Sequence, residues 1–132
     1  MAAISAFPEI PDTMHGAFGT EVTKTASADI LGGQAVQINS NGTVAPATAS
    51  TQKIIGVALY DIPAGTEGAI RVVGVARCAN ADGATAITAG AAVTAGALGG
   101  VTAHSTGTAL GIALEPIAGG ATGLVALGVF TA

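Results

Sequence analysis

Two stretches of this chain, KIIGVALYDIPAGTEG at residues 53–68 and ALGIALEPIAGGATG at residues 109–123, share one pattern of small and branched side chains. Gly56 in the first stretch matches Gly111 in the second, a spacing of 111 − 56 = 55 residues. Self-similarity at a fixed spacing is typical of a duplicated structural unit. No catalytic type of residue is repeated with it, so the pattern favours architecture over chemistry. Further pairs at this spacing are Ala58 and Ala113, Leu59 and Leu114, and Ile62 and Ile117. Upstream, Val36 matches Val93 and Val44 matches Val101, at a spacing of 57 (93 − 36 = 57; 101 − 44 = 57).

We therefore predict an internally duplicated domain over residues 28–132, with repeats at about 28–78 and 85–131, and an extended arm over residues 1–27. The arm holds both methionines and two of the three phenylalanines. Its prolines favour an extended path. Large apolar side chains in so short a segment favour docking on a partner, with a disordered tail as the alternative. The candidate docking residues are Phe7, Pro8, Ile10, Pro11 and Phe18.

The repeats have the pattern of β-strands in an all-β small barrel or sandwich. In IIGVALY, residues 54–60, period-two alternation places Ile55, Val57 and Leu59 on one face. Both faces of this run are apolar or small, which is expected of a strand covered on two sides. Residues 84–98 are rich in alanine, the best helix former, so a helix stays the alternative there. The pattern does not predict the order of the strands.

Glycine positions indicate turns and close contacts. Asn41-Gly42 and Asp82-Gly83 are candidate two-residue hairpin turns, because these residue types tolerate positive φ. Gly56 and Gly111 lie inside apolar runs, where glycine often marks a bulge or a close approach of another backbone. The remaining turn candidates are Pro63-Ala64-Gly65 and Gly119-Gly120.

Composition limits what the chain can do. Its 132 residues are 50% hydrophobic but only 3% aromatic, and small side chains bury little area each, so we expect the thin core to be supplemented by self-association. A net charge of −4 with four basic residues excludes a cationic nucleic-acid surface. The lone Cys78 is predicted to be a buried structural thiol. The uncharged stretch from Gly83 to Leu114 lacks the dense apolar block of a membrane span.

No arrangement of residues predicts catalysis, a cofactor or a metal site. His15 and His104 lack neighbouring His, Cys or carboxylate residues at ligand spacing. The chain has no phosphate-binding glycine loop and no nucleophile elbow. We therefore predict that the protein is not an enzyme. The scattered carboxylates are Glu9, Asp12, Glu21, Asp29, Asp61, Glu67, Asp82 and Glu115.

Two arginines are unusual in a chain so poor in basic residues. Arg71 and Arg77 share one face of the predicted strand AIRVVGVARC at 69–78, together with Val73 and Val75, while Ile70 and Val72 share the other. One interpretation is a solvated strand face. The other is a pair of inter-subunit ion pairs with scattered carboxylates, which would contribute about 0–1 kcal/mol each and act mainly on specificity.

The chain resembles the capsid decoration, or cement, proteins of tailed bacteriophages. The resemblance lies in Gly33–Ile38, Ile54–Leu59 and Ala64–Cys78, with a weaker echo at Ala109–Phe130. It implies a β-rich virion protein, usually a trimer, that binds the outside of an icosahedral capsid. It also implies stabilisation of the expanded shell by bridging coat subunits, with the N-terminal segment contacting the major capsid protein or a neighbouring copy.

From these observations we expect a structural virion protein on the capsid exterior, made in the host cytoplasm because the N-terminus lacks the pattern of a secretion signal. Its partners would be the coat protein and itself, not nucleic acid or membrane. The alternative is a small β module that binds carbohydrate or a receptor on a virion or cell surface. Sugar sites usually present aromatic platforms, and Tyr60 and Phe130 are the only aromatics after the arm. An enzyme ranks last.

Overall fold

A computed structural model describes residues 19–48, 53–80, 85–96, 99–104 and 108–131. Within these ranges the chain is all-β and contains no α-helix, which confirms the predicted fold class. The strands are β1 (Gly19–Thr25), β2 (Ala35–Ile38), β3 (Val44–Pro46), β4 (Ile54–Ala58), β5 (Glu67–Ala79), β6 (Ala92–Ala95), β7 (Val101–Ala103), β8 (Thr108–Ala113) and β9 (Thr122–Thr131).

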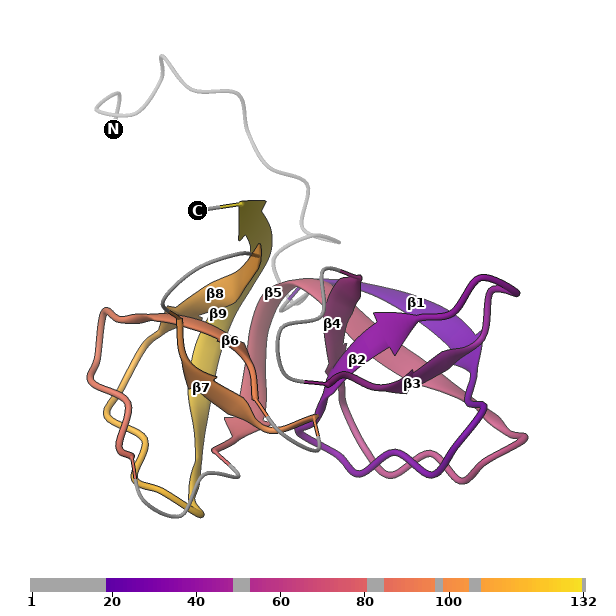
Figure 1. Cartoon of the computed structure of the whole chain (residues 1–132), viewed down its shortest axis with the longest axis horizontal. Coiled ribbons are helices and arrows are strands. Elements are labelled where there is room, and N and C mark those ends of the chain that lie inside the picture. Colours follow the sequence, from indigo (N-terminus) through magenta and orange to yellow (C-terminus); the bar gives the residue numbers. More distant parts are fainter. Residues whose placement is uncertain (1–18, 49–52, 81–84, 97–98, 105–107, 132) are drawn as a thin grey trace, which may run out of the picture.

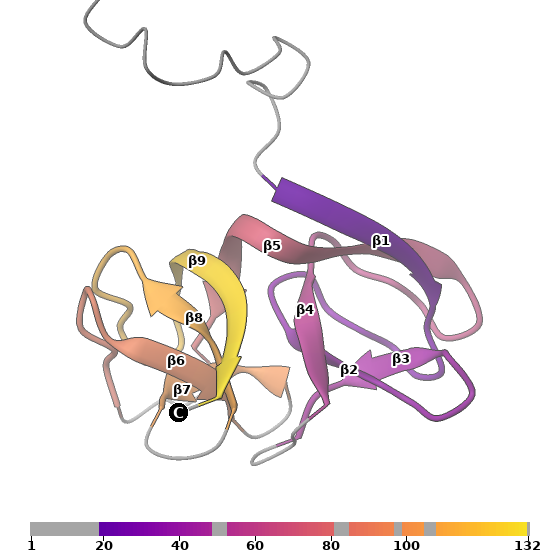
Figure 2. The ribbon, with the colours of Figure 1, turned by 90° about the horizontal axis from the view of Figure 1, so that it is seen from above.

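All nine strands belong to one sheet with the order β3-β2-β4-β5-β9-β8-β6-β7, and β1 also pairs with β5. Every pairing between strands is antiparallel. The strands form two groups side by side, and the long β5 passes from one group to the other (Figures 1 and 2). We call residues 19–73 the first half and residues 74–131 the second half.

β5 serves both halves because its two parts have different partners. Its first part pairs with β1 from Glu67 to Gly74, and its second part pairs with β9 from Gly74 to Ala79. Gly74 has a φ of 120°, which an L-residue rarely adopts, and it lies where the partner changes. Figure 2 shows β5 bending between the two groups of strands.

Matching strands of the two halves pair in the same register. Ala35 lies opposite Val57 in the first half, and Ala92 lies opposite Ile112 in the second. The positions correspond with a spacing of 57 in β2 and β6 (92 − 35 = 57) and of 55 in β4 and β8 (112 − 57 = 55). The isolated bridges Ile30–Ile62 and Ile87–Ile117 also correspond. Thus one pattern of backbone hydrogen bonds occurs twice in the described chain.

The correspondence includes β1, which lies inside the predicted arm. In the first half Ala26, after β1, donates its N–H to Thr66 O at 2.9 Å and accepts from Gly65 N at 2.8 Å. In the second half Asn80, after β5, makes the equivalent pair of bonds with Ala121 O and Gly120 N at 2.9 and 2.7 Å. Residues 19–25 are therefore part of the sheet, which differs from the predicted boundary at residue 27. The physical reason is that β1 pairs with the backbone groups of β5 from Glu67 to Gly74.

Two clusters of buried side chains fill the fold. The first-half core contains only first-half residues, and its buried members are Ala26, Ile30, Val36, Val44, Ala58, Ile62 and Ile70. The shared core joins second-half residues to four from the first half, namely Ala35, Ala47, Ile54 and Val57. Its other buried members are Ala76, Cys78, Ile87, Val93, Ala95, Val101, Leu110, Ala113, Ile117, Val125 and Leu127. The halves are therefore joined by buried apolar packing as well as by β5.

The prediction of close backbone approach at Gly56 and Gly111 is confirmed. A Cβ added to Gly56 would lie 2.1 Å from the carbonyl oxygen of Arg71, and one added to Gly111 would lie 2.1 Å from that of Ala126. Atoms cannot approach so closely without moving the neighbouring strand, so both positions require glycine.

The predicted faces of β4 are wrong before Gly56. Ile54 packs with Val57 in the shared core, whereas Ile55 packs against the first-half core together with Ala58. The register with β2 shifts at this point, since Val36 lies opposite Gly56 and Gln37 lies opposite Ile54. Ile55 is thus the extra residue of a β-bulge, which interrupts the simple alternation of faces.

The predicted turns fall into two groups. Asn41-Gly42 lies in the connection from β2 to β3, which spans residues 39–43 and is therefore longer than the predicted two-residue turn. Gly42 has a φ of 88°, and Gly65 and Gly120 lie in corresponding turns with φ of 84° and 77°. Asp82-Gly83 lies outside the described residues. Within 84–98, residues 92–95 form β6, so the described part of this stretch is not helical.

Candidate interaction surfaces

The candidate docking residues of the arm all lie outside the described residues. Phe7, Pro8, Ile10, Pro11 and Phe18 precede Gly19, where the description of the structure begins. Their docking role therefore stays a prediction. What the structure adds is the position at which this segment joins the body, at the start of β1.

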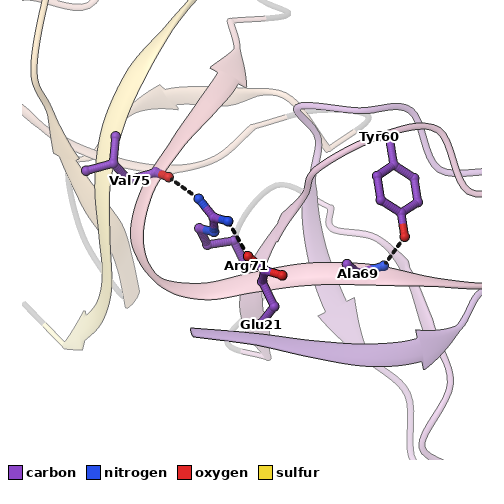
Figure 3. Close-up of polar contacts among 5 residues, drawn as sticks. All are labelled: Glu21, Tyr60, Ala69, Arg71 and Val75. Atoms are coloured by element: carbon purple, nitrogen blue, oxygen red, sulfur yellow. Dashed lines mark hydrogen bonds and ion pairs between the residues drawn. The ribbon is translucent and has the colours of Figure 1, made fainter. Parts of the chain in front are cut away.

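Arg71 has partners within its own chain. Its Nη2 forms an ion pair with Glu21 Oε2 on the neighbouring β1, and its Nη1 donates a hydrogen bond to Val75 O at 2.9 Å (Figure 3). The Arg71 side chain is only 12% exposed, whereas that of Glu21 is 41% exposed. This guanidinium therefore ties β1 to β5 close to the bend in β5.

Arg77 is exposed and lies on the second part of β5. Its Nη1 is 3.4 Å from Thr122 Oγ1 on the paired strand β9, a long and weak hydrogen bond. Sequence reasoning grouped the two arginines on one strand face, but the structure places them in different halves and in different environments. An ion pair of either arginine with another copy stays a prediction.

Tyr60 and Glu115 occupy equivalent positions, and the side chain of each accepts a hydrogen bond from a backbone N–H, one with a hydroxyl and the other with a carboxylate. The N–H of Ala69 donates to the Tyr60 hydroxyl at 3.0 Å (Figure 3), and the N–H of Leu124 donates to Glu115 Oε2 at 2.9 Å. Both pairs are separated by nine residues, and both acceptor positions correspond (115 − 60 = 55). The Tyr60 hydroxyl is therefore engaged by the sheet, although the residue is 52% exposed.

Two carboxylates support the loops of the first half. Asp61 Oδ1 accepts from the N–H of Gly32 at 2.8 Å, and Asp29 Oδ1 accepts from the N–H of Ala64 at 2.9 Å. Each bond crosses between the loop before β2 and the loop after β4. These acidic side chains therefore have structural roles as acceptors of backbone hydrogen bonds.

The sequence predictions for Cys78 and the histidines have different outcomes. Cys78 is fully buried, and this burial raises the pKa of its thiol to about 12, so the expected structural thiol is confirmed. His104 is half-buried after β7, and its backbone N–H donates to Ala92 O at 2.8 Å. His15 lies outside the described residues. Among the described residues no group of three His, Cys, Asp or Glu side chains could hold a metal ion.

Asn80 is a buried polar residue that sequence reasoning missed. Its Nδ2 donates to Thr85 O at 2.8 Å and to Ile117 O at 3.2 Å. It follows β5, so it ties the end of that strand to two loops of the second half. An asparagine after a long apolar strand was the only available indication, and the sequence pattern did not distinguish it from a turn residue.

Sequence reasoning also missed an exposed apolar surface on the second half. Ile112 in β8 is 43% exposed and Leu114 just after it is 50% exposed. Their counterparts Val57 and Leu59 are fully and partly buried in the shared core. The repeat itself was the signal that could have found them, because equivalent positions in tandem units need not have equivalent neighbours. In the described part of the chain, no helix is long and apolar enough to cross a membrane.

Comparison with solved structures shows that this fold occurs in a bacteriophage head fiber protein. The crystal structure of the N base of the head fiber protein gp8.5 of bacteriophage phi29 superposes with a TM-score of 0.67 at 16% sequence identity, covering 83% of this chain and 93% of that chain. At this identity the likeness shows the fold alone. No curated protein sequence matches the chain.

The family comparison covers nearly the whole chain. The model of the phage cement protein family matches residues 13–129, a range that includes β1 to β8 and most of β9. It therefore contains both halves of the fold and the last residues of the segment before β1. The chain belongs to the phage cement protein family and is thus a structural protein of the virion.

Proposed function

We propose that this protein binds the outside of an icosahedral phage capsid and stabilises the expanded shell by bridging coat subunits. The observation that carries the proposal is the match to the phage cement family over both halves. The fold is consistent with a mechanical role, because each half is braced by its own set of backbone bonds and the halves share a core. Bridging would work by avidity, since several modest contacts made at once resist separation far better than one.

We further propose that the protein acts as a homotrimer. The chain is short, its core is built mainly from alanine, valine and isoleucine, and large apolar side chains are exposed on strands. Burying such side chains between copies contributes roughly 25 cal/mol per Å² of apolar area removed from water. Association would therefore add the burial that a thin core lacks.

The segment before β1 is proposed to dock on the coat protein or on a neighbouring copy. Phe7, Ile10 and Phe18 are large apolar residues in a chain that is only 3% aromatic, and residues 1–18 directly precede β1 in the sequence. Deletion of residues 1–27 would remove β1 and leave the first part of β5 without that partner strand. Deletion of residues 1–18 alone keeps β1 and therefore tests docking without damaging the sheet.

The test compares shells of the source phage that carry the full chain, a chain lacking residues 1–18, or no protein. Quantitative mass spectrometry of purified particles should find the full chain at a copy number comparable with that of the coat protein. Decorated shells should withstand higher temperature than undecorated ones. A few copies per particle, or equal stability with and without the protein, would overturn the cement function. Binding of the truncated chain as tight as that of the full chain would overturn only the role of residues 1–18.

The carbohydrate- or receptor-binding alternative rests on Tyr60 as an exposed aromatic platform. Its hydroxyl accepts the N–H of Ala69, and Glu115 makes the equivalent bond in the second half. Tyr60 thus has a role in the sheet that explains its presence. We therefore do not advance that alternative.

A further inference from the structure

The strands β4 and β8 occupy equivalent positions in the two halves, but they differ in how their outer faces are covered. In β4, Ile55 and Ala58 pack with the first-half core, and Ile54 and Val57 pack against the second half in the shared core. In β8, Leu110 and Ala113 are buried in the shared core, whereas Ile112 is 43% exposed. Ile112 on the outer face of β8 therefore lacks the cover that Val57 has on β4.

Three pairs of equivalent residues differ in exposure, whereas a fourth pair on these strands, Ile54 and Ala109, is buried in both halves. Val57 is fully buried and Ile112 is exposed; Leu59 packs partly buried against the shared core, and Leu114 is 50% exposed. Ala35 in β2 is fully buried, and its counterpart Ala92 in β6 is half-buried. We call Ala92, Ile112 and Leu114 the acceptor surface. The equivalent residues of the first half, Ala35, Val57 and Leu59, are the ones that pack against the second half in the shared core.

On the other side of the contact between the halves, the second-half residues are the more buried members of each equivalent pair. Ala95, Leu110 and Leu127 of the second half are buried in the shared core. Their first-half counterparts are Ile38 (95 − 38 = 57), Ile55 (110 − 55 = 55) and Val72 (127 − 72 = 55), and all three are half-buried. We call Ile38, Ile55 and Val72 the donor surface; Ile38 and Ile55 also pack against the edge of the first-half core. It corresponds to the side of the second half that covers the first.

Equivalent turns of the two halves also differ in whether they contact the other half. The turn between β6 and β7 approaches the first half closely at Gly99, where an added Cβ would lie 3.2 Å from the Cβ atoms of Gln34 and Pro46. The corresponding turn between β2 and β3 is exposed, and an added Cβ on Gly42 would meet nothing within 4 Å. The residue equivalent to Pro46 is Ala103 (103 − 46 = 57), which is also exposed.

We propose that the acceptor surface of one copy binds the donor surface of a second copy, repeating between chains the contact that joins the two halves within a chain. The two surfaces differ, so the interface is heterologous and the copies associate head to tail. This inference rests on the proposed self-association and specifies its interface. Three copies closing a ring would place six halves in equivalent contacts, and Ile112 would then be buried as Val57 is.

The first test introduces a charge at an exposed apolar position of the acceptor surface. Ile112→Lys should raise the dissociation constant between copies by about 10- to 100-fold, equivalent to about 1.4–2.8 kcal/mol, because a lysine there cannot be buried against Ile38 or Ile55. The matched control is Leu31→Lys, at a 57% exposed position outside both surfaces, which should associate as the unaltered chain does. Analytical ultracentrifugation measures both. Unchanged association of Ile112→Lys would overturn the proposal.

A second test does not depend on disrupting the interface. The two cysteine substitutions are Ser40→Cys, in the β2–β3 turn, and Ala103→Cys, at the end of β7 on the acceptor side; both positions are exposed. Co-expressed chains carrying one change each should cross-link to each other with a short bismaleimide, while either variant alone should not. The buried Cys78 serves as the background in the unaltered chain. Equal cross-linking of either variant alone would indicate an isologous contact and overturn the head-to-tail arrangement.

The outcomes separate this inference from the proposed function. If the unaltered chain stabilises shells and Ile112→Lys still associates normally, the cement function stands and the interface is wrong. If association depends on Ile112 but the unaltered chain neither binds nor stabilises shells, the interface stands and the cement function is wrong.

Discussion

The two halves of this protein make the same backbone contacts with different side chains and in different surroundings. Val36 and Val93, or Ile62 and Ile117, occupy equivalent buried positions. By contrast, Val57 is buried and Ile112 is exposed, because only the first half has a second half packed on its outer face. The comparison teaches that a duplicated unit preserves its own core, whereas its outer faces depend on which unit comes next.

The strongest test of the comparison is at the two glycines of closest approach. Gly56→Ala and Gly111→Ala should each reduce the free energy of unfolding by about 3 kcal/mol or more, because the new Cβ would overlap the carbonyl oxygen of Arg71 or Ala126. Gly42→Ala is the control: its Cβ has open space and only the positive φ opposes it, at a cost of about 1–2 kcal/mol. Urea denaturation measures all three. A tolerated change at one of the first two positions would show that the halves are not equally constrained.

A second comparison concerns burial at one equivalent pair. Val57→Ala should cost about 1.5–3 kcal/mol, because Val57 is fully buried between the halves. Ile112→Ala should cost less than about 0.5 kcal/mol in dilute protein, because Ile112 is exposed in the single chain. Thermal unfolding over a range of protein concentrations gives both values. A large loss for Ile112→Ala at every concentration would contradict the difference in burial.

A third comparison tests whether Tyr60 and Glu115 do the same work. Tyr60→Phe and Glu115→Leu each remove the acceptor of one backbone N–H and should each cost about 0.5–1.5 kcal/mol. Glu115→Gln keeps an oxygen acceptor and should cost less than Glu115→Leu. Chemical denaturation, with amide hydrogen exchange at Ala69 and Leu124, provides the measurement. Unchanged exchange at Ala69 in Tyr60→Phe would refute the role given to that hydroxyl.

The last comparison concerns thiol reactivity and is expected to change stability at neutral pH least. Cys78 lies opposite Gly123, and its counterpart Lys24 lies opposite Gly68. Burial raises the pKa of the Cys78 thiol from 9.0 to about 12, so at pH 8 the reactive thiolate should be about 1,000-fold scarcer than for an exposed cysteine. Lys24 is half-buried. In a Cys78→Ala background, a cysteine introduced by Lys24→Cys should therefore react with a thiol reagent about as fast as an accessible cysteine does.

The same pKa has a consequence for stability at high pH. The folded pKa of Cys78 lies above the unfolded value, so the folded chain holds the proton more tightly. The stability linked to this group is full below about pH 9 and falls as the pH rises toward about 12. Cys78→Ala should remove this component of the pH dependence. Fast labelling of folded Cys78 at pH 8 would contradict the buried position on which both expectations depend.

Much of the fold could be predicted from local residues. The doubled pattern, a turn at Asn41-Gly42 and the need for glycine at Gly56 and Gly111 could be predicted from the types of neighbouring residues. The strand residues that these two glycines approach could not. The faces of β4 could not be predicted, because the bulge at Ile55 changes the alternation and depends on pairing with β2. The candidate surfaces were harder still, since Arg71 meets Glu21 from a strand fifty residues away in the chain.

The amino-acid sequence by itself determined that this protein is built from β-strands in a doubled pattern with a small-residue core, because strand alternation, turn glycines and side-chain size are properties of neighbouring residues. Tertiary structure alone decided that residues 19–25 join the sheet, that β5 serves both halves, and that Val57 is buried while Ile112 is not. Those outcomes depend on contacts between distant segments. A sequence pattern that is the same in both halves cannot distinguish the half that is covered from the half that is left open.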